Sequence, residues 1–188
     1  MSTLWLVRHA RPLGADGLCY GRLDIAADAA ASRQAAQALA GALPPKVVAV
    51  RHSPLQRCEL LALDLQALRP DFASKPEPSI QEMDFGTWEG RAWNAIAQTE
   101  ITAWAGNLGT HAPGGGEPLS AMLARVALAL RDAAACAQAE GGDMVWITHA
   151  GVARCVQWLQ AHGAARLPQA HEWPVAAPGF GAWVRVAL

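Results

Sequence analysis

Short apolar runs recur along this chain and are separated by stretches with helical spacing. Residues 4–7, 47–50 and 144–148 are each rich in β-branched or aromatic side chains, which is typical of buried strands in a parallel sheet. Residues 180–187 show a similar pattern near the end of the chain and predict a final strand. We therefore expect a mostly parallel central sheet.

The segments between these runs have the pattern of amphipathic helices. Residues 29–43 carry apolar side chains at helical spacing and are followed by two prolines, and a longer pattern over residues 120–139 ends before two glycines. Residues 152–161 predict a further helix. Alternating strands and helices predict an α/β fold, a three-layer sandwich with helices on both faces of the sheet. Because no linker, repeat or low-complexity tract divides the chain, we expect residues 1–188 to form a single domain.

Basic side chains follow two of the predicted strands directly. Arg8 and His9 come after the first strand, and His149 comes after the strand at residues 144–148. Parallel strands end at the same edge of an open α/β sheet, and ligands bind at that edge, so we expect these side chains to converge. Two imidazoles and a guanidinium at one point suit chemistry on an anion.

A third predicted strand leads into a helix that begins near Ser53. Ser53 has the residue type of an N-cap, Pro54 suits the first helical position, and Gln56 completes a capping box. Arg57 would then lie near the positive end of the helix, where its guanidinium and the free backbone N–H groups can meet an anion. The alternative for an arginine taken alone is a solvated surface position.

The composition excludes several classes of partner. A formal net charge of −1 over 188 residues gives no long-range attraction to nucleic acid or to an anionic membrane. No apolar run reaches the roughly 20 residues that cross a bilayer, and the N-terminal residues do not resemble a signal peptide. The four cysteines form no CxxC pair, which favours reduced thiols and a cytoplasmic protein.

The histidine spacing gives no indication of a metal centre. No two histidines are two or four residues apart and no carboxylate cluster accompanies them, so we expect neither a metal nor another cofactor. The histidines outside the predicted site are expected in loops or at the surface, with one of them flanking the site: His52, His111, His162 and His171. Most of the eight tryptophans are expected in the core, although an aromatic binding surface is the alternative.

The clustered side chains suggest phosphoryl transfer. Arg8 and Arg57 could bind a phosphate and stabilise the extra negative charge that develops during its transfer. Nearby cations would keep the His9 imidazole neutral, so that it could act as a nucleophile. The leaving alkoxide needs a proton donor, and Glu82 is the first candidate because it opens a glycine- and aromatic-containing loop over residues 82–90. Asp84 and Glu89 of the same loop are the alternatives.

Five ordered motifs resemble the histidine phosphatase superfamily, which has the phosphoglycerate mutase-like fold. They run from residue 4 to about residue 155 and are Leu6-Val7-Arg8-His9, Ser53-Pro54-Leu55-Gln56-Arg57, Glu82 with Phe85-Gly86-Thr87-Trp88-Glu89-Gly90, Pro113-Gly114-Gly115-Gly116-Glu117 and Thr148-His149-Ala150-Gly151. The resemblance implies that His9 is the phosphorylated nucleophile and that Arg8, Arg57 and His149 form the phosphate pocket. It also implies that Glu82 is the general acid and then the base that activates water, without a metal.

The first loop resembles one branch of this superfamily. Arg11-Pro12 together with residues 17–24 is similar to α-ribazole phosphatase-like proteins of cobalamin biosynthesis. Tyr20 and Arg22 in this loop are expected to contact the substrate, and bracing of the loop is the alternative. Many relatives have Gly-Glu-Thr after the Arg-His pair, where this chain has Ala10-Arg11-Pro12, and His52 replaces a small hydroxyl residue. These departures leave the substrate open, as does Glu117, which either caps the next helix or reaches the pocket.

The leading functional hypothesis is a phosphomonoesterase that acts on a small phosphorylated metabolite, with α-ribazole 5′-phosphate as one candidate. A phosphoglycerate-mutase-like phosphotransferase is the first alternative, but such mutases resemble longer chains with segments that cover the site, and only about two dozen residues separate Gly90 from Gly114 here. A protein-histidine phosphatase or regulatory phosphoprotein binder is the second, and the complete catalytic set argues against a binder without turnover. The expected partner is a small phosphorylated metabolite, and a homodimer is the assembly compatible with this hypothesis.

Overall fold

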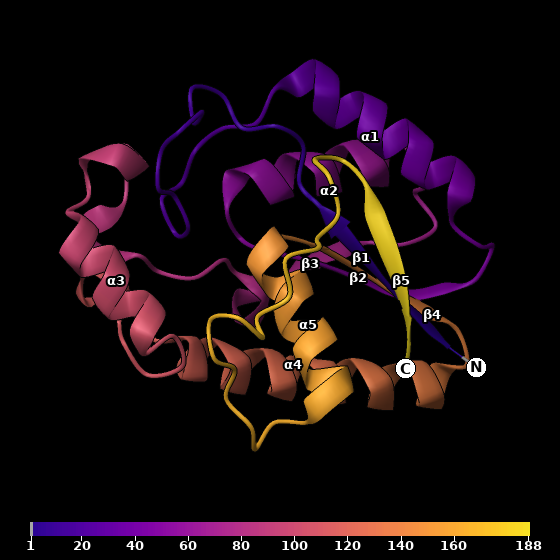
Figure 1. The fold of residues 1–188 in the computed structure, drawn as a ribbon. Helices are drawn as coiled ribbons and strands as arrows, with labels where there is room; N and C mark the ends of the chain where they lie inside the picture. Colours follow the sequence, from indigo (N-terminus) through magenta and orange to yellow (C-terminus); the bar gives the residue numbers. More distant parts are fainter. Residues whose placement is uncertain (1) are drawn as a thin grey trace.

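A five-stranded sheet forms the middle layer of the protein in a computed structural model that describes residues 2–188 (Figure 1). The strands lie in the order β3-β2-β4-β1-β5, and β5 is the antiparallel one. Their bounds are β1 Thr3–Arg8, β2 Val47–His52, β3 Ser74–Pro76, β4 Asp143–Thr148 and β5 Trp183–Ala187. The three strands predicted from residues 4–7, 47–50 and 144–148 are therefore the parallel centre of the sheet.

Helices cover both faces of this sheet. Helices α1 (Ala29–Ala42) and α2 (Gln56–Leu68) pack on one face, and α4 (Leu119–Glu140) and α5 (Ala150–His162) pack on the other (Figure 1). Helix α3 (Gln98–Gly106) lies to one side of the sandwich with the segments around it. Four short 3₁₀ turns complete the elements, at Pro78–Ile80, Gly86–Trp88, Trp93–Ala95 and Pro113–Gly115. The predicted α/β sandwich is confirmed.

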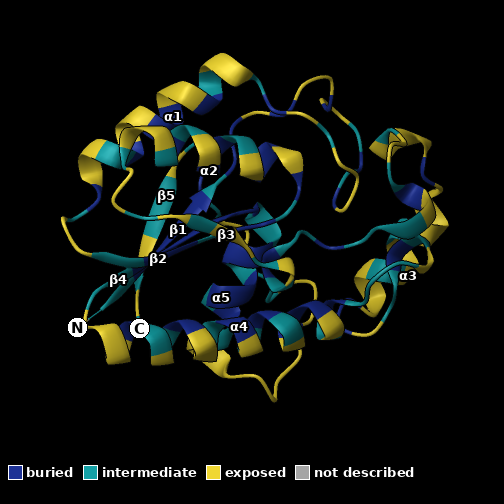
Figure 2. Cartoon of the chain, turned by 180° about the vertical axis from the view of Figure 1, so that it is seen from behind, coloured by how far each residue is buried: buried dark blue, intermediate teal, exposed yellow. Residues whose placement is uncertain are grey.

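The alternation of side chains along β1 explains the two layers. Leu4 and Leu6 are fully buried against the α4 and α5 face, whereas Trp5 and Val7 are buried against α1 and α2. Successive side chains of a strand point to opposite faces, so a strand covered on both sides must be apolar at every position. Figure 2 shows this buried centre between the more exposed outer faces of the helices.

The strand register brings the two catalytic-site candidates together. In the parallel pair of β1 and β4, Arg8 lies opposite Thr148, so the residues that follow them leave the sheet side by side. The backbone N–H of His9 donates to the Thr148 carbonyl oxygen at 3.0 Å and extends the ladder by one residue. His9 and His149 therefore occupy equivalent places at the carboxyl edge of the sheet.

The start of α2 differs from the prediction. The helix begins at Gln56 with Leu55 at its N-cap position, and the side chain that accepts from the Gln56 backbone N–H is that of Asp24 in the first loop, at 2.8 Å. Ser53 is instead buried and its hydroxyl lies 2.8 Å from His149 Nε2, while the Gln56 side chain donates to the Asp24 carbonyl oxygen. The capping-box prediction is wrong because contacts with distant segments hold both side chains.

Further differences from the prediction concern three elements: β3, α3 and β5. The final strand starts at Trp183 rather than residue 180, and neither the short β3 nor α3 was predicted from the sequence. β3 has only three residues, and α3 buries no residue fully, so neither leaves a strong apolar pattern.

All four cysteines are free, and within residues 2–188 no helix has the length and apolarity to cross a bilayer.

Candidate active site

A cavity of about 310 Å³ lies where the carboxyl ends of β1 and β4 meet the loops that follow them. Its charged and polar walls come from the first loop, from α2, from the loop before α3 and from the first turn of α5. The polar side chains that line it are Arg8, His9, Tyr20, Arg57, Glu82, His149 and Arg154. The structure thus brings together every predicted site residue except Arg22.

His9 is held with one ring nitrogen engaged and the other free. The ring is 2% exposed, and its Nδ1 lies 2.7 Å from the carbonyl oxygen of Ala10. A carbonyl only accepts, so Nδ1 carries the proton and Nε2 keeps a lone pair. Burial, together with the positive charge of Arg57, lowers the pKa of His9 to about 3. His9 is therefore a neutral imidazole with an available nucleophilic nitrogen.

Arg8 is fixed against the segment that precedes β5. Its Nη1 donates to the Pro178 carbonyl oxygen at 3.1 Å, and the guanidinium carbon lies 3.9 Å from the centroid of the Phe180 ring. The same ring lies 5.6 Å from the His9 ring, centroid to centroid. Phe180 therefore contacts both members of the Arg-His pair and limits how far either can move.

Arg57 joins the cavity to the first loop. The residue is fully buried, and its terminal nitrogens donate to the carbonyl oxygens of Gly21 and Leu23. Its Nε is buried without a partner within residues 2–188. The guanidinium carbon also lies 5.5 Å from the centroid of the Tyr20 ring. The alternative of a solvated surface arginine is excluded.

His149 has the complementary arrangement of ring nitrogens. Its Nε2 lies 2.8 Å from Ser53 Oγ and 3.5 Å from Cys58 Sγ, whereas Nδ1 is buried without a partner in the described chain. Burial and the charge of Arg57 hold the pKa of His149 well below its usual value, so the ring is neutral. If the Ser53 hydroxyl donates to Nε2, the proton is on Nδ1 and is free for a ligand. The two imidazole centroids are 5.1 Å apart.

The Glu82 carboxylate lines the cavity and lies against the first turn of α5. Its Oε2 accepts from the backbone N–H of Gly151 at 2.9 Å, and its Oε1 accepts from the N–H of Met83 at 3.1 Å. A Cβ atom on Gly151 would lie only 2.0 Å from Oε1. Glycine at this position is what lets the carboxylate approach the helix closely.

Arg125 of α4 supports the backbone around Glu82. Its guanidinium donates to the carbonyl oxygens of Ser79, Gln81 and Glu82 and pairs with the Glu117 carboxylate at 2.7 Å. Glu117 therefore neither caps α4 nor lines the cavity, and both sequence interpretations of this residue are wrong. It neutralises the arginine that holds the Glu82 segment.

The two alternative acids have structural contacts elsewhere. The Glu89 carboxylate accepts from four backbone N–H groups, and these belong to residues of two loops: Gly21, Arg22, Leu23 and Phe85. Asp84 accepts from the Gly86 N–H and pairs with Arg22 at 3.4 Å. Neither carboxylate lines the cavity, so Glu82 is the acid that the geometry favours among the three.

Other polar residues near the site lie away from the cavity. The Arg22 side chain is 55% exposed, lies 3.4 Å from Asp84 and does not line the cavity, so its contact with a substrate stays a prediction. Arg11 pairs with the exposed Asp16 at 2.8 Å. His52 is the last residue of β2 and is buried, so its prediction as a loop or surface residue is wrong. The sequence positions of these residues do not show which neighbouring side chains they contact in the folded protein.

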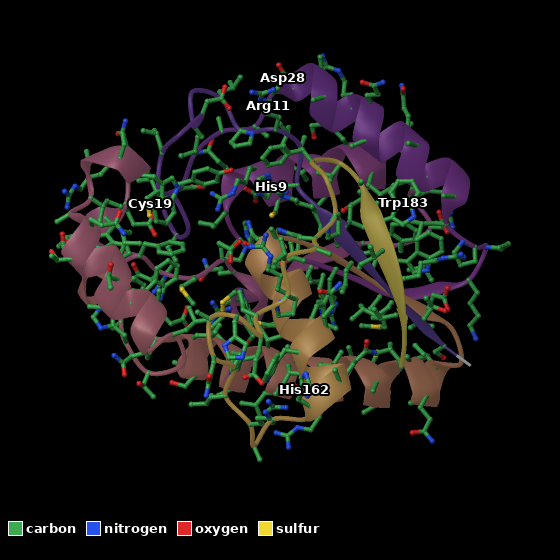
Figure 3. The ribbon with its side chains drawn as sticks, viewed as in Figure 1. His9, Arg11, Cys19, Asp28, His162 and Trp183 are labelled. Carbon is green, nitrogen blue, oxygen red and sulfur yellow. The ribbon has the colours of Figure 1, made fainter. Side chains whose placement is uncertain are left out.

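Several aromatic residues line the cavity, among them tryptophans that the sequence analysis expected in the core, with an aromatic binding surface as the alternative. Phe85, Trp93, Trp104 and Trp173 form part of its wall, whereas Trp5 and Trp146 are buried on strands as expected. Figure 3 shows His9 in the interior of the molecule, between the sheet and the side chains around α3. The only sequence signal was the position of Phe85 inside the Glu82 loop. Within residues 2–188, no group of three or more His, Cys, Asp or Glu side chains is arranged to hold a metal.

Comparison with solved structures shows the same fold in phosphatases. The mycobacterial glucosyl-3-phosphoglycerate phosphatase is 21% identical, with a TM-score of 0.81 over 98% of this chain and 89% of that chain. TTHB049, a protein from Thermus thermophilus, is 30% identical, with a TM-score of 0.71 over 98% of this chain and 92% of that chain. None of the curated proteins matches the sequence significantly.

The sequence also matches one protein family over most of its length. Residues 4–176 match the family described as histidine phosphatase superfamily (branch 1), which is most of the chain and includes all five motifs. The match agrees with the order of elements and with the cavity at the sheet edge. This protein belongs to the histidine phosphatase superfamily.

Proposed function

We propose that the protein is a metal-independent phosphomonoesterase that acts on a small phosphorylated metabolite through a phosphohistidine at His9. The observation that carries this proposal is the His9 ring. Its Nδ1 is committed to the Ala10 carbonyl and its Nε2 is free in a cavity that also contains two arginines, a second histidine and a carboxylate. A neutral, oriented imidazole beside fixed cations is what nucleophilic attack on a phosphate ester requires.

The first chemical step transfers the phosphoryl group to the protein. His9 Nε2 attacks phosphorus, the bond from phosphorus to the ester oxygen breaks, and Glu82 in its protonated form gives a proton to the leaving alkoxide. Arg8, Arg57 and the free Nδ1–H of His149 stabilise the charge on the remaining phosphoryl oxygens.

The second step regenerates the protein. The Glu82 carboxylate accepts a proton from water, the water oxygen bonds to phosphorus, and the phosphorus–nitrogen bond to His9 breaks, which releases inorganic phosphate and restores the neutral ring. The exchange needs no redox change and no further co-reactant. Transfer to water rather than to a second metabolite is what separates this proposal from the phosphomutase alternative.

α-Ribazole 5′-phosphate remains one substrate candidate within this proposal. Tyr20, one of the two residues that suggested it, lines the cavity, whereas Arg22 does not. The candidate therefore depends on stacking of its base on aromatic side chains alone. A kcat/KM for α-ribazole 5′-phosphate no higher than that for simple sugar phosphates would remove it and leave the phosphatase proposal intact.

Phosphoenzyme trapping tests the proposed function. Rapid quenching of wild-type protein with a radiolabelled phosphate ester should yield a protein-bound phosphate that is acid-labile and base-stable, with release of inorganic phosphate on longer incubation. His9→Gln should neither label nor turn over while its circular dichroism stays that of the wild type. Labelling of the His9→Gln protein at the wild-type rate would overturn the assignment, and transfer of phosphate only to an added alcohol would favour the phosphomutase.

Sensitivity to inhibitors provides a second test. A solved structure of the mycobacterial phosphatase is a complex with VO3, and we expect orthovanadate to inhibit this protein because two arginines and two histidines can surround a five-coordinate oxyanion. Activity should survive dialysis against EDTA. Loss of activity on dialysis that a divalent ion restores would contradict the metal-independent mechanism.

A further inference from the structure

The cavity wall divides into a charged part and an apolar part. The charged part contains the arginines and histidines described above. Arg154 also lines this part, and its positive charge adds to the larger effect of burial in lowering the pKa of Arg8. The rest of the wall is formed by aromatic and aliphatic side chains, chiefly Phe85, Trp93, Trp104 and Met122. A phosphate bound at the charged end would have its ester group against the apolar end.

Phe85, Trp93 and Trp104 form one preorganised aromatic surface, which we call the aromatic wall. The Trp93 and Trp104 planes are within 13° of parallel with centroids 6.5 Å apart, and Phe85 meets both edge-on with centroids 5.8 and 5.9 Å away. Trp88 packs behind the wall. It is fully buried, its ring contacts the rings of Trp93 and Trp104, and its indole N–H donates to the Glu100 carboxylate. These rings need no reorganisation to meet a ligand.

Two features of the aromatic wall indicate that it is a binding surface and not only core. Trp93 lines the cavity and is 38% exposed, so its ring is accessible to a ligand there. The Trp104 indole N–H is buried without a partner in the described chain, so a buried donor remains unsatisfied there. Neither feature is explained by packing within the fold.

The same wall disfavours polar ester groups. A sugar, or a carboxylate such as that of a phosphoglycerate, would lose water on entering and would find, among the side chains of Phe85, Trp93, Trp104 and Met122, only the two indole N–H groups as donors and no charged partner. Burying hydroxyl or carboxylate groups without partners costs free energy, whereas a planar apolar group gains from stacking and from leaving water. The wall therefore discriminates by the chemistry of the alcohol.

We propose that the aromatic wall is the binding site for the leaving group and that the preferred substrates are phosphate monoesters of alcohols that carry an aromatic or similarly planar apolar group. The inference depends on the proposed function for its catalytic consequence, since it assigns the alcohol part of the same substrate. It identifies Trp93 as a residue that determines specificity without taking part in the chemistry.

The test compares benzyl phosphate with glycerol 1-phosphate, both of which release a primary alcohol. Wild-type kcat/KM should be at least about tenfold higher for benzyl phosphate, and Trp93→Ala should reduce that ratio by about five- to tenfold. The matched control is Trp183→Ala. Trp183 lies on β5, on the opposite side of the molecule from α3 (Figure 3), and its loss should leave the preference unchanged.

A binding measurement keeps this inference separate from the proposed function. Benzylphosphonate should bind the wild-type protein more tightly than methylphosphonate in calorimetry, and Trp93→Ala should remove most of that difference, whether or not the protein hydrolyses esters. Equal kcat/KM for the two esters, or equal affinity for the two phosphonates, would overturn the aromatic specificity. Failure to hydrolyse either ester, with benzylphosphonate still preferred, would overturn the phosphatase proposal alone.

Discussion

At the scale of single residues, the site depends on which nitrogen of each histidine is engaged. His9 has Nδ1 bound to a backbone carbonyl, which leaves a lone pair on Nε2, whereas the contact of His149 Nε2 with a hydroxyl fits either tautomer. With Ser53 as the donor, His149 carries its proton on Nδ1, and the two rings, whose centroids are 5.1 Å apart, then have opposite capacities. The neighbours of each ring, not the rings themselves, determine these roles.

Ser53 is expected to be the positioning residue for His149. Ser53→Ala removes the hydroxyl that holds Nε2, so the Nδ1–H tautomer is no longer favoured and kcat should fall by about 10- to 100-fold with little change in KM. Ser53→Thr, which keeps the hydroxyl, should restore most of the rate. The ¹⁵N shifts of the His149 ring check the mechanism, because a purely structural role for Ser53 would leave the tautomer unchanged.

Arg57 is expected to stabilise the transition state and to hold the first loop. The planar guanidinium of Arg57 donates to the Gly21 and Leu23 carbonyl oxygens and can also offer a pair of N–H groups to a phosphate. The single ammonium group of Arg57→Lys cannot make both sets of contacts. We expect kcat to fall by about 10²–10³-fold in Arg57→Ala and to recover only partly in Arg57→Lys. Wild-type activity in the lysine variant would show that a point charge is sufficient.

At the scale of elements, strand ends and helix starts place the reacting groups, and loops are tied to them by single side chains. The Glu89 carboxylate connects the loop at residues 21–23 to Phe85, and Arg125 connects the Glu82 segment to α4. Each tie satisfies several backbone groups that would otherwise lack partners away from regular structure. The loops that form much of the cavity wall are therefore held in place by side-chain hydrogen bonds.

Gly151 offers a test of this arrangement in the first turn of α5. Alanine suits a helix better than glycine, so Gly151→Ala should keep or raise the melting temperature. Its new Cβ would displace the Glu82 carboxylate, and kcat should fall by about 10- to 100-fold. Steady-state kinetics and calorimetric melting on the same preparation check both parts. Unchanged kcat with unchanged stability would show that the position of Glu82 is not needed.

At the scale of the whole molecule, the buried neutral histidines link stability to pH. The pKa of His9 falls from 6.5 in the unfolded chain to about 3 in the folded protein, mainly through burial. Between these values the unfolded chain binds more protons than the folded one, so the free energy of unfolding decreases as pH falls below about 6.5. Burial lowers the pKa of His149 as well, which adds to the same effect.

Urea denaturation at two pH values measures this linkage. From pH 7.5 to pH 5, His9 alone should account for a loss of about 1–2 kcal/mol in the free energy of unfolding. The His9→Gln protein should therefore lose less stability over this interval than the wild type. Parallel losses in the two proteins would mean that His9 is protonated in the folded state, which would also weaken its assignment as the nucleophile.

Much of the fold and the position of the candidate site was predictable because local sequence patterns determine it. The apolar strands that end in Arg8-His9 and in His149, and the helical patterns between them, indicated the sandwich and the edge where the site lies, since strand direction and covalent adjacency fix where the next residue goes. Glu82 and Arg57 could be identified from the motifs around them. These predictions required no knowledge of side-chain partners.

The tertiary structure alone decided how the side chains pair. Ser53 contacts His149, 96 residues away, instead of capping α2, and Arg22 turns to Asp84 instead of the cavity. Trp93 and Trp104 form a cavity wall, although their tryptophan identity is equally typical of a core. Such partners depend on which distant segments meet and on which rotamers then pack, and no local pattern of apolar and polar residues carries that information.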